Sequence, residues 1–304
     1  MTESKIAKHV KLIDIDAYSP PQIADKIDKI ALVKAKLGIT QTFALGVLAG
    51  LYIGIGAQFA TLVISDSTLH FGINSLIAGV VFSLGLMLVV VGGAELFTGN
   101  CLIIMGYVSK RVTTMEVANN WTVSFSGNFV GSLLMVFLMY NTHQWELFNH
   151  MVGAKALLIA NTKVNLSFKF ALARGVLCNA MVCLAVWLCF SGRSSADKIL
   201  SILFPIGGFV ASGFEHCVAN MYFIPIGIFL SKQPEVVVAA EKMAGKPIDL
   251  SLLTWKGFFV NNLVPVTLGN IVGGVILVGI VFWFVYLRPV IKINFNVKQD
   301  FFDK

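Results

Sequence analysis

The chain has 304 residues, of which 57% are hydrophobic and 13% are charged, about half the charged share of a typical soluble protein. So few charged residues cannot cover a water-exposed surface. The composition therefore excludes a soluble enzyme or a disordered scaffold and predicts a protein embedded in lipid. The net charge of +7 does not indicate nucleic-acid binding, because the Lys and Arg residues form short clusters between apolar stretches and no continuous basic face.

Six apolar stretches follow a polar N-terminal segment at residues 1–40. Each is long enough for a spanning helix, which needs about 20 mainly apolar residues. They lie at residues 41–65, 73–109, 118–140, 168–191, 199–230 and 257–286. We therefore expect an all-α membrane protein with a six-span pore domain over residues 41–287 and a C-terminal tail at 288–304. The excess of Lys and Arg near the two ends, and in the loops on their side, predicts cytoplasmic termini in the cell membrane.

The second and fifth stretches are too long for one straight helix, which rises about 1.5 Å per residue and would extend beyond the bilayer. Each contains one glutamate near its middle, Glu95 or Glu215, with glycines beside it. We interpret both as broken helices, since irregular backbone at membrane depth is tolerated only where it is buried in protein or lines a watery cavity. The two glutamates are then structural: each accepts backbone N–H groups released by its break or pairs with a partner.

The sequence contains an internal repeat. Residues 119–138 and 261–280 share asparagine and glycine at corresponding positions, and FALGVL at 43–48 corresponds to FALARGVL at 170–177. Each break also has an asparagine five residues after its glutamate. Because three spans are an odd number, the second copy is inserted in the opposite orientation. Such a 3+3 inverted repeat with discontinuous helices is typical of transporters and channels, whose substrate site lies near the midplane.

Three polar residues near the breaks are candidates for the substrate path. His216 is the one histidine inside a predicted span; an ionisable group there is costly and a functional candidate by default, and histidine exchanges protons near neutral pH. A neutral ring bonded to a neighbouring helix is the structural alternative. Thr98 either donates a hydrogen bond to a small anion or caps its loop. Asn179, in the fourth span, either faces the pore or bonds to a neighbouring helix.

Cations and large apolar side chains near the breaks are further candidates. Lys163 and Arg174, near the outer end of the fourth span, either concentrate anions in a vestibule or mark the membrane interface. Six apolar residues either narrow the pore or pack the core: Phe82, Leu86, Leu96, Phe97, Val182 and Phe209.

These residues together suggest a transport mechanism. A bare anion loses its hydration at apolar constrictions, whereas a neutral small acid does not. We therefore expect a weak-acid anion to enter a basic vestibule, meet Thr98, Asn179 and His216, gain a proton directly or through water, and cross as the neutral acid. The five cysteines form no CxxC pair and predict inert packing. The sequence predicts neither a cofactor nor a metal.

Much of the chain, about residues 20–290, resembles the formate/nitrite transporter family. The matching segments are FSLGLMLVVVGGAELFTGN (82–100), SFSGNFVG (124–131), RGVLCNAMVCLAVW (174–187), FVASGFEHCVANMYFIPIGI (209–228) and NLVPVTLGNIVGG (262–274). The resemblance implies an aquaporin-like fold and a homopentamer in which each protomer has its own pore.

The resemblance also assigns roles to individual residues. It implies that His216 is the central histidine, that Thr98 is the threonine of a flexible loop, and that Asn179 and Asn220 are polar neighbours of this site. It implies that Lys34 and Lys163 are vestibule lysines. The slit residues that it implies are Leu86, Leu96 and Phe97 on one side and Phe82 and Phe209 on the other.

Formate is the first substrate that we expect, because residues 15–37 resemble formate transporters associated with formate dehydrogenase. Nitrite is the second, because the formate channels lack a cation at the position of Arg174 and nitrite-type members often have one. Hydrosulfide and short monocarboxylates remain alternatives, as does a pore for neutral solutes. An enzyme that uses His216 and Glu215 as an acid/base pair is a further alternative, although the sequence contains no GxSxG or HExxH motif.

Overall fold

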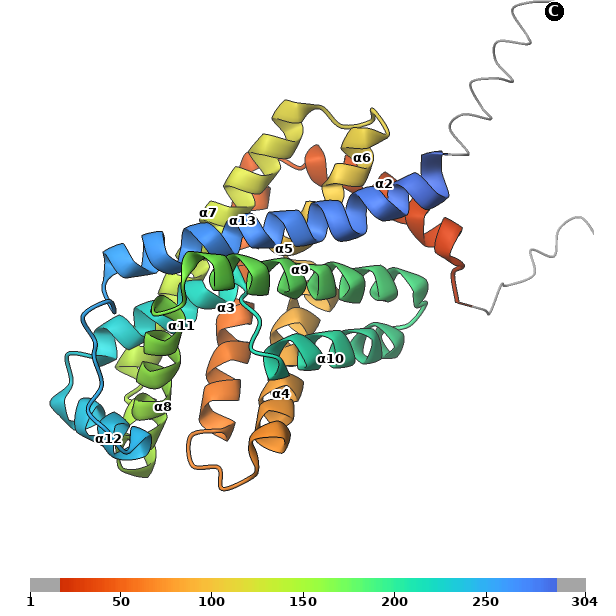
Figure 1. Ribbon diagram of the computed structural model, residues 1–304. Coiled ribbons are helices and arrows are strands. Elements are labelled where there is room, and N and C mark those ends of the chain that lie inside the picture. Colours follow the sequence, from red (N-terminus) through yellow and green to blue (C-terminus); the bar gives the residue numbers. More distant parts are fainter. Residues whose placement is uncertain (1–16, 289–304) are drawn as a thin grey trace, which may run out of the picture.

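The computed structural model describes residues 17–288, which form helices and connecting loops without a strand (Figure 1). The predicted C-terminal tail therefore lies outside the described residues except for Arg288, and so does the first part of the predicted N-terminal segment. Five helices in the described range are long and apolar enough to cross a membrane, and a bent helix pair raises the number to as many as six. The expected all-α membrane architecture is confirmed.

The first half of the fold begins with a short helix and continues with three spans. These elements are α2 (Pro20–Ala35), α3 (Ile39–Val63), the broken span formed by α4 (Phe71–Gly92), α5 (Phe97–Asn100), η1 (Cys101–Ile103) and α6 (Ile104–Val108), and α7 (Thr114–Asn141). The predicted second span, 73–109, is thus a long helix followed by a shorter helical segment, with a break between them at residues 93–96.

The second half follows the same order. Its elements are η2 (Gln144–Glu146), α8 (Leu147–Val164), α9 (Phe168–Ser191), α10 (Ser195–Ala211), α11 (Cys217–Leu230), α12 (Pro234–Ala244), η3 (Gly257–Leu263), α13 (Val264–Val272), η4 (Gly273–Ile280) and η5 (Trp283–Leu287). The predicted fifth span, 199–230, is α10 and α11 with a break at residues 212–216. Helix α12 bends away from α11 by 111°, and the last four elements form one continuous helix over residues 257–287.

The repeat is larger than the sequence predicted, because α2 and α8 each precede one set of three spans. Neither helix appears among the predicted spans, since each carries lysines and lacks an uncharged apolar run of spanning length. Both bury an apolar face, and each has a lysine in its last turn, Lys34 in α2 and Lys163 in α8. Each half is therefore one short helix followed by three spans, the second of which is broken.

Close helix packing is the same in both halves. A Cβ atom at Gly131 in α7 would lie 2.0 Å from the carbonyl oxygen of Val47 in α3, and a Cβ atom at Gly273 would lie 2.0 Å from that of Val176 in α9. Only glycine permits backbones to approach this closely, as is typical of membrane helix interfaces. Because Val47 and Val176 occupy corresponding positions of the repeated segments, the matching contacts confirm that the two halves are copies of one unit.

Candidate functional site

Both broken spans are interrupted by the same kind of turn. Gly93 follows α4 with φ of +82°, and Gly213 follows α10 with φ of +66°. Glycine adopts this left-handed conformation without the steric penalty of a side chain, and it commonly ends helices in this way. Each turn ends its long helix and leaves backbone groups that need new hydrogen-bond partners.

An asparagine from the third span of each half supplies these partners. Asn128 Oδ1 accepts from the backbone N of Phe97 at 2.9 Å, while its Nδ2 donates to the carbonyls of Gly46 and Glu95 at 2.9 Å each. All three contacts are buried. The side chain therefore fastens the start of α5 and the break before it to α3.

Asn270 makes the matching contacts in the second half. Its Oδ1 accepts from the backbone N of Cys217 at 2.9 Å, and its Nδ2 donates to the carbonyls of Gly175 at 2.8 Å and Glu215 at 2.9 Å. The sequence places Asn128 and Asn270 at corresponding repeat positions without indicating their role. A polar side chain repeated inside apolar spans is the signal that identifies such residues.

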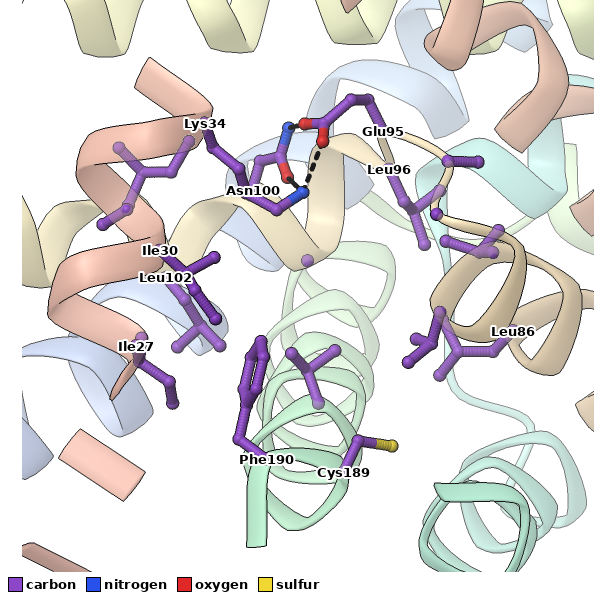
Figure 2. Close-up of a pocket in the computed structure, with 18 of the residues that line it drawn as sticks. Ile27, Ile30, Lys34, Leu86, Glu95, Leu96, Asn100, Leu102, Cys189 and Phe190 are labelled. Atoms are coloured by element: carbon purple, nitrogen blue, oxygen red, sulfur yellow. Dashed lines mark hydrogen bonds and ion pairs between the residues drawn. The ribbon is translucent and has the colours of Figure 1, made fainter. Parts of the chain in front are cut away.

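The two predicted structural glutamates each bind a lysine and an asparagine. Glu95 Oε1 lies 2.6 Å from Lys34 Nζ, and Glu95 Oε2 accepts from Asn100 Nδ2 at 2.8 Å. Figure 2 shows this group at one end of a cavity. The charges of Lys34 and Glu95 compensate each other, so this lysine is an ion-pair partner that also lines the cavity.

The second half repeats the arrangement with Lys163. Its Nζ lies 2.8 Å from Glu215 Oε1, and Glu215 Oε2 accepts from Asn220 Nδ2 at 2.7 Å. Asn220 Nδ2 also donates to Asn262 Oδ1 at 2.7 Å. The amide hydrogens of Asn220, which we expected beside the substrate path, are therefore donated within the protein.

His216 and Thr98 connect the two halves of the repeat. His216 Nε2 lies 2.9 Å from Thr98 Oγ1, and His216 Nδ1 accepts from the backbone N of Ala219 at 3.1 Å, which caps α11. Because Nδ1 is an acceptor, the neutral ring carries its proton on Nε2, and that N–H donates to the threonine hydroxyl. His216 and Thr98 are both buried, so the contact joins the starts of the two short helices inside the protein.

Asn179 holds Thr98 in place. Its Nδ2 donates to the Thr98 carbonyl at 3.2 Å and to the Asn270 carbonyl at 2.7 Å. Cys183 Sγ also lies 3.5 Å from the Thr98 carbonyl. Both amide hydrogens of Asn179 are thus donated to backbone, so its contacts are those of the interhelical alternative and link the Thr98 turn to the second half.

The six expected constriction residues are all buried and belong to one apolar core cluster. The rings of Phe82 and Phe209 meet edge to face with centroids 5.7 Å apart, and Phe209 stacks on His216 at 6.1 Å. Leu86 and Leu96 line the cavity described below. Phe97 and Val182, by contrast, are absent from its lining.

A mainly apolar cavity of about 280 Å³ lies on the face that carries α2 (Figure 2). Lys34, Glu95 and Asn100 lie at one end of it, and Leu86 and Leu96 lie on the side opposite α2. It leads from the outside of the protein toward the first break, since Gly93 and Leu96 both line it. Within residues 17–288, no group of His, Cys, Asp and Glu residues is arranged to hold a metal ion.

Arg174 lies beside the second break. Its side chain is exposed, and its Nη1 is 3.4 Å from the carbonyl oxygen of Gly213. Arg174 is the third of the expected vestibule cations. Unlike Lys34 and Lys163, it contacts no carboxylate in the described part of the chain.

Comparisons with known proteins agree with this architecture. A sequence model of the family described as formate/nitrite transporter matches residues 21–284. The chain is 41% identical over 276 residues to the formate channel FocA of Escherichia coli (strain K12), with 90% of this chain and 96% of that protein covered. It is 39% identical to a probable formate transporter of Methanothermobacter thermautotrophicus, with 89% and 97% covered.

A solved structure has the same fold. A pentameric formate channel with formate bound superposes on this chain with a TM-score of 0.73 at 41% identity, covering 82% of this chain and 98% of the other. These relatives are named as channels or transporters, which excludes the membrane-enzyme alternative.

Proposed function

Since the chain belongs to the formate/nitrite transporter family, we propose that it is a membrane channel or transporter for small monovalent weak-acid anions and that formate is its substrate. The observation that carries the proposal is the buried contact between His216 and Thr98 at the junction of the inverted halves. A hydroxyl and an imidazole N–H are donors that a carboxylate can bind. The relatives named as formate channels or formate transporters support formate as the ligand.

Transport proceeds by neutralisation of the anion at this contact. The anion enters through a vestibule, binds the Thr98 hydroxyl in place of the ring, and receives a proton either through water or from His216 after the ring has taken up a second proton from water. The neutral acid then passes the apolar residues, because it has no charge to desolvate. We assign the constrictions to Phe82, Leu86, Leu96, Phe97, Val182 and Phe209.

Two asparagines and two glutamates support this path without donating to the substrate. Asn179 positions the Thr98 carbonyl, and Asn220 positions Glu215, because their amide hydrogens are donated to these groups. Glu95 and Glu215 fix the breaks by pairing with Lys34 and Lys163. The lysines mark the two ends of the path.

We further propose that five copies assemble in the cell membrane, each with its own pore, as the pentameric relative supports. In this arrangement residues 41–287 form the pore domain, and residues 1–40 and 288–304 lie in the cytoplasm. The face that carries α2 is then the cytoplasmic face.

The pH dependence of formate flux tests the proton role of His216. Purified protein in liposomes with an internal pH indicator reports formate and proton movement together. Replacing His216 by Phe should abolish proton-linked flux or flatten its pH dependence. His216→Asn is the matched control for folding, because asparagine retains a side-chain acceptor for the α11 cap but cannot titrate. An unaltered pH dependence in His216→Asn would contradict the mechanism.

Nitrite is the second candidate, because the matching family is described as formate/nitrite transporter. Competition of formate uptake by nitrite, acetate, lactate and hydrosulfide at two pH values ranks the substrates. Formate flux that is independent of pH, accompanied by flux of neutral solutes, would favour a neutral-solute pore instead.

A further inference from the structure

The surroundings of the two breaks differ in one charged residue, Arg174. Arg174 begins the segment RGVL at 174–177, where the first half has LGVL at 45–48. The backbone contacts confirm the equivalence, because the Leu45 carbonyl accepts from Glu95 N at 3.2 Å and the Arg174 carbonyl accepts from Glu215 N at 3.4 Å. The two positions therefore share their backbone role and differ in the side chain.

The guanidinium lies beside the second break, on the face opposite α2. Arg174 Nη1 contacts the carbonyl of Gly213, which has the same left-handed conformation as Gly93 in the first half. Gly93 lines the cavity on the α2 face. Because the halves are inverted copies, Gly213 occupies the corresponding place on the opposite face, and Arg174 lies next to it.

This cation is not neutralised as the lysines are. Lys34 and Lys163 each lie within ion-pair distance of a glutamate. Arg174 contacts one carbonyl and no carboxylate in the described range. A guanidinium has five N–H donors and is always charged, so its exposed side chain retains donors and a full charge for an anion.

We propose that Arg174 is an anion-capture residue that makes the two mouths of the pore unequal. A small carboxylate such as formate binds its guanidinium on the face opposite α2 before moving to Thr98 and His216. The mouth beside α2 has Leu45 at this position and lacks the capture step. The inference rests on the proposed function. It adds that half-saturation of flux occurs at a lower anion concentration on the Arg174 face than on the α2 face.

Flux measured from each face tests this inequality. The full chain is reconstituted in liposomes, its orientation is determined by protease access to the termini, and formate flux is recorded from either side at several salt concentrations. Arg174→Gln keeps a donor for the Gly213 carbonyl and removes the charge, whereas Arg174→Lys keeps the charge. We expect Arg174→Gln to raise the half-saturating concentration on the Arg174 face about three- to tenfold, and to weaken its salt dependence. The value on the α2 face should not change.

The reciprocal exchange strengthens the test. Leu45→Arg places a guanidinium beside Gly93 and should lower half-saturation on the α2 face, while Arg174→Lys should stay close to the parent protein. If Arg174→Gln leaves both faces unchanged or shifts them equally, the capture role is wrong. If the parent protein carries no formate under any condition, the proposed function fails instead, so the two failures are distinguishable.

Discussion

The two breaks are held by the same kinds of contact, but they carry different side chains at the start of the helix that follows. In each, a glycine turn, a glutamate–lysine pair and an asparagine from the third span fix the start of a short helix. The residue before that short helix is Leu96 in one half and His216 in the other, and the second residue within it is Thr98 or Val218. The contact between Thr98 and His216 therefore takes one residue from each half, at positions where the two copies differ, whereas the contacts that fix the breaks are the same in both copies.

Loss of the buried glutamates should produce the largest effect and should distinguish the halves. Removing one partner of a buried ion pair costs about 3–5 kcal/mol, because the other charge remains without compensation. Glu215→Ala should cost more than Glu95→Ala, since the Lys163 side chain is 14% exposed and the Lys34 side chain is 30% exposed. Thermal unfolding of the purified protein in detergent measures both.

The glutamine variants at the two sites are the controls, since they keep an acceptor for the neighbouring asparagine. A greater loss of stability in Glu95→Ala than in Glu215→Ala would contradict the ranking.

Close packing should respond equally in the two halves. Gly131→Ala and Gly273→Ala each place a Cβ atom 2.0 Å from a backbone carbonyl oxygen, which forces the helices apart at a cost of about 1–3 kcal/mol. Equal shifts of the unfolding temperature are expected. Gly72→Ala is the matched control, because nothing lies within 4 Å of its Cβ position. A large loss at one site alone would show that the two interfaces are not equivalent.

The smallest expected effect concerns a buried carboxyl group in α2 that has no counterpart in α8. Asp28 in α2 lies six residues before Lys34, where α8 has Leu157 six residues before Lys163. Burial raises the pKa of the Asp28 carboxyl above its usual value, although Arg111 at 3.0 Å opposes the shift. The folded protein thus takes up this proton at a higher pH than the unfolded chain, so lowering the pH through the raised pKa stabilises the fold.

Asp28→Asn lacks this proton uptake. As the pH falls from about 7 to about 4, the parent protein should gain stability relative to the variant, measured as the difference between their unfolding temperatures. The opposite trend would show that the ion pair with Arg111 outweighs burial. Leu157→Asn in α8 should produce no corresponding pH dependence.

The sequence was sufficient to predict both breaks, because an apolar stretch too long for one straight helix, with a glutamate and glycines at its middle, does not fit a continuous span. It also identified Thr98 and His216, which the structure brings within 2.9 Å. The predicted repeat of three spans in opposite orientations is confirmed. These features depend on local patterns, namely hydropathy, glycine and intramembrane charge.

What the sequence did not predict depends on contacts between distant segments. The pairing of Lys34 with Glu95 and of Lys163 with Glu215 requires α2 and α8 to pack against the breaks, and hydropathy does not indicate those helices as part of the repeat. The orientation of Asn179 was open for the same reason. Its two carbonyl partners belong to Thr98 and Asn270, which only the folded chain brings together.

The helix cap at His216 has a mechanical consequence. Nδ1 accepts the Ala219 N–H only while it keeps its lone pair, so an imidazolium ring loses this cap of α11, while Asn270 still accepts the Cys217 N–H. In the proposed mechanism, protonation of this ring therefore removes one cap hydrogen bond of α11 and adds a positive charge beside Thr98 in a single event.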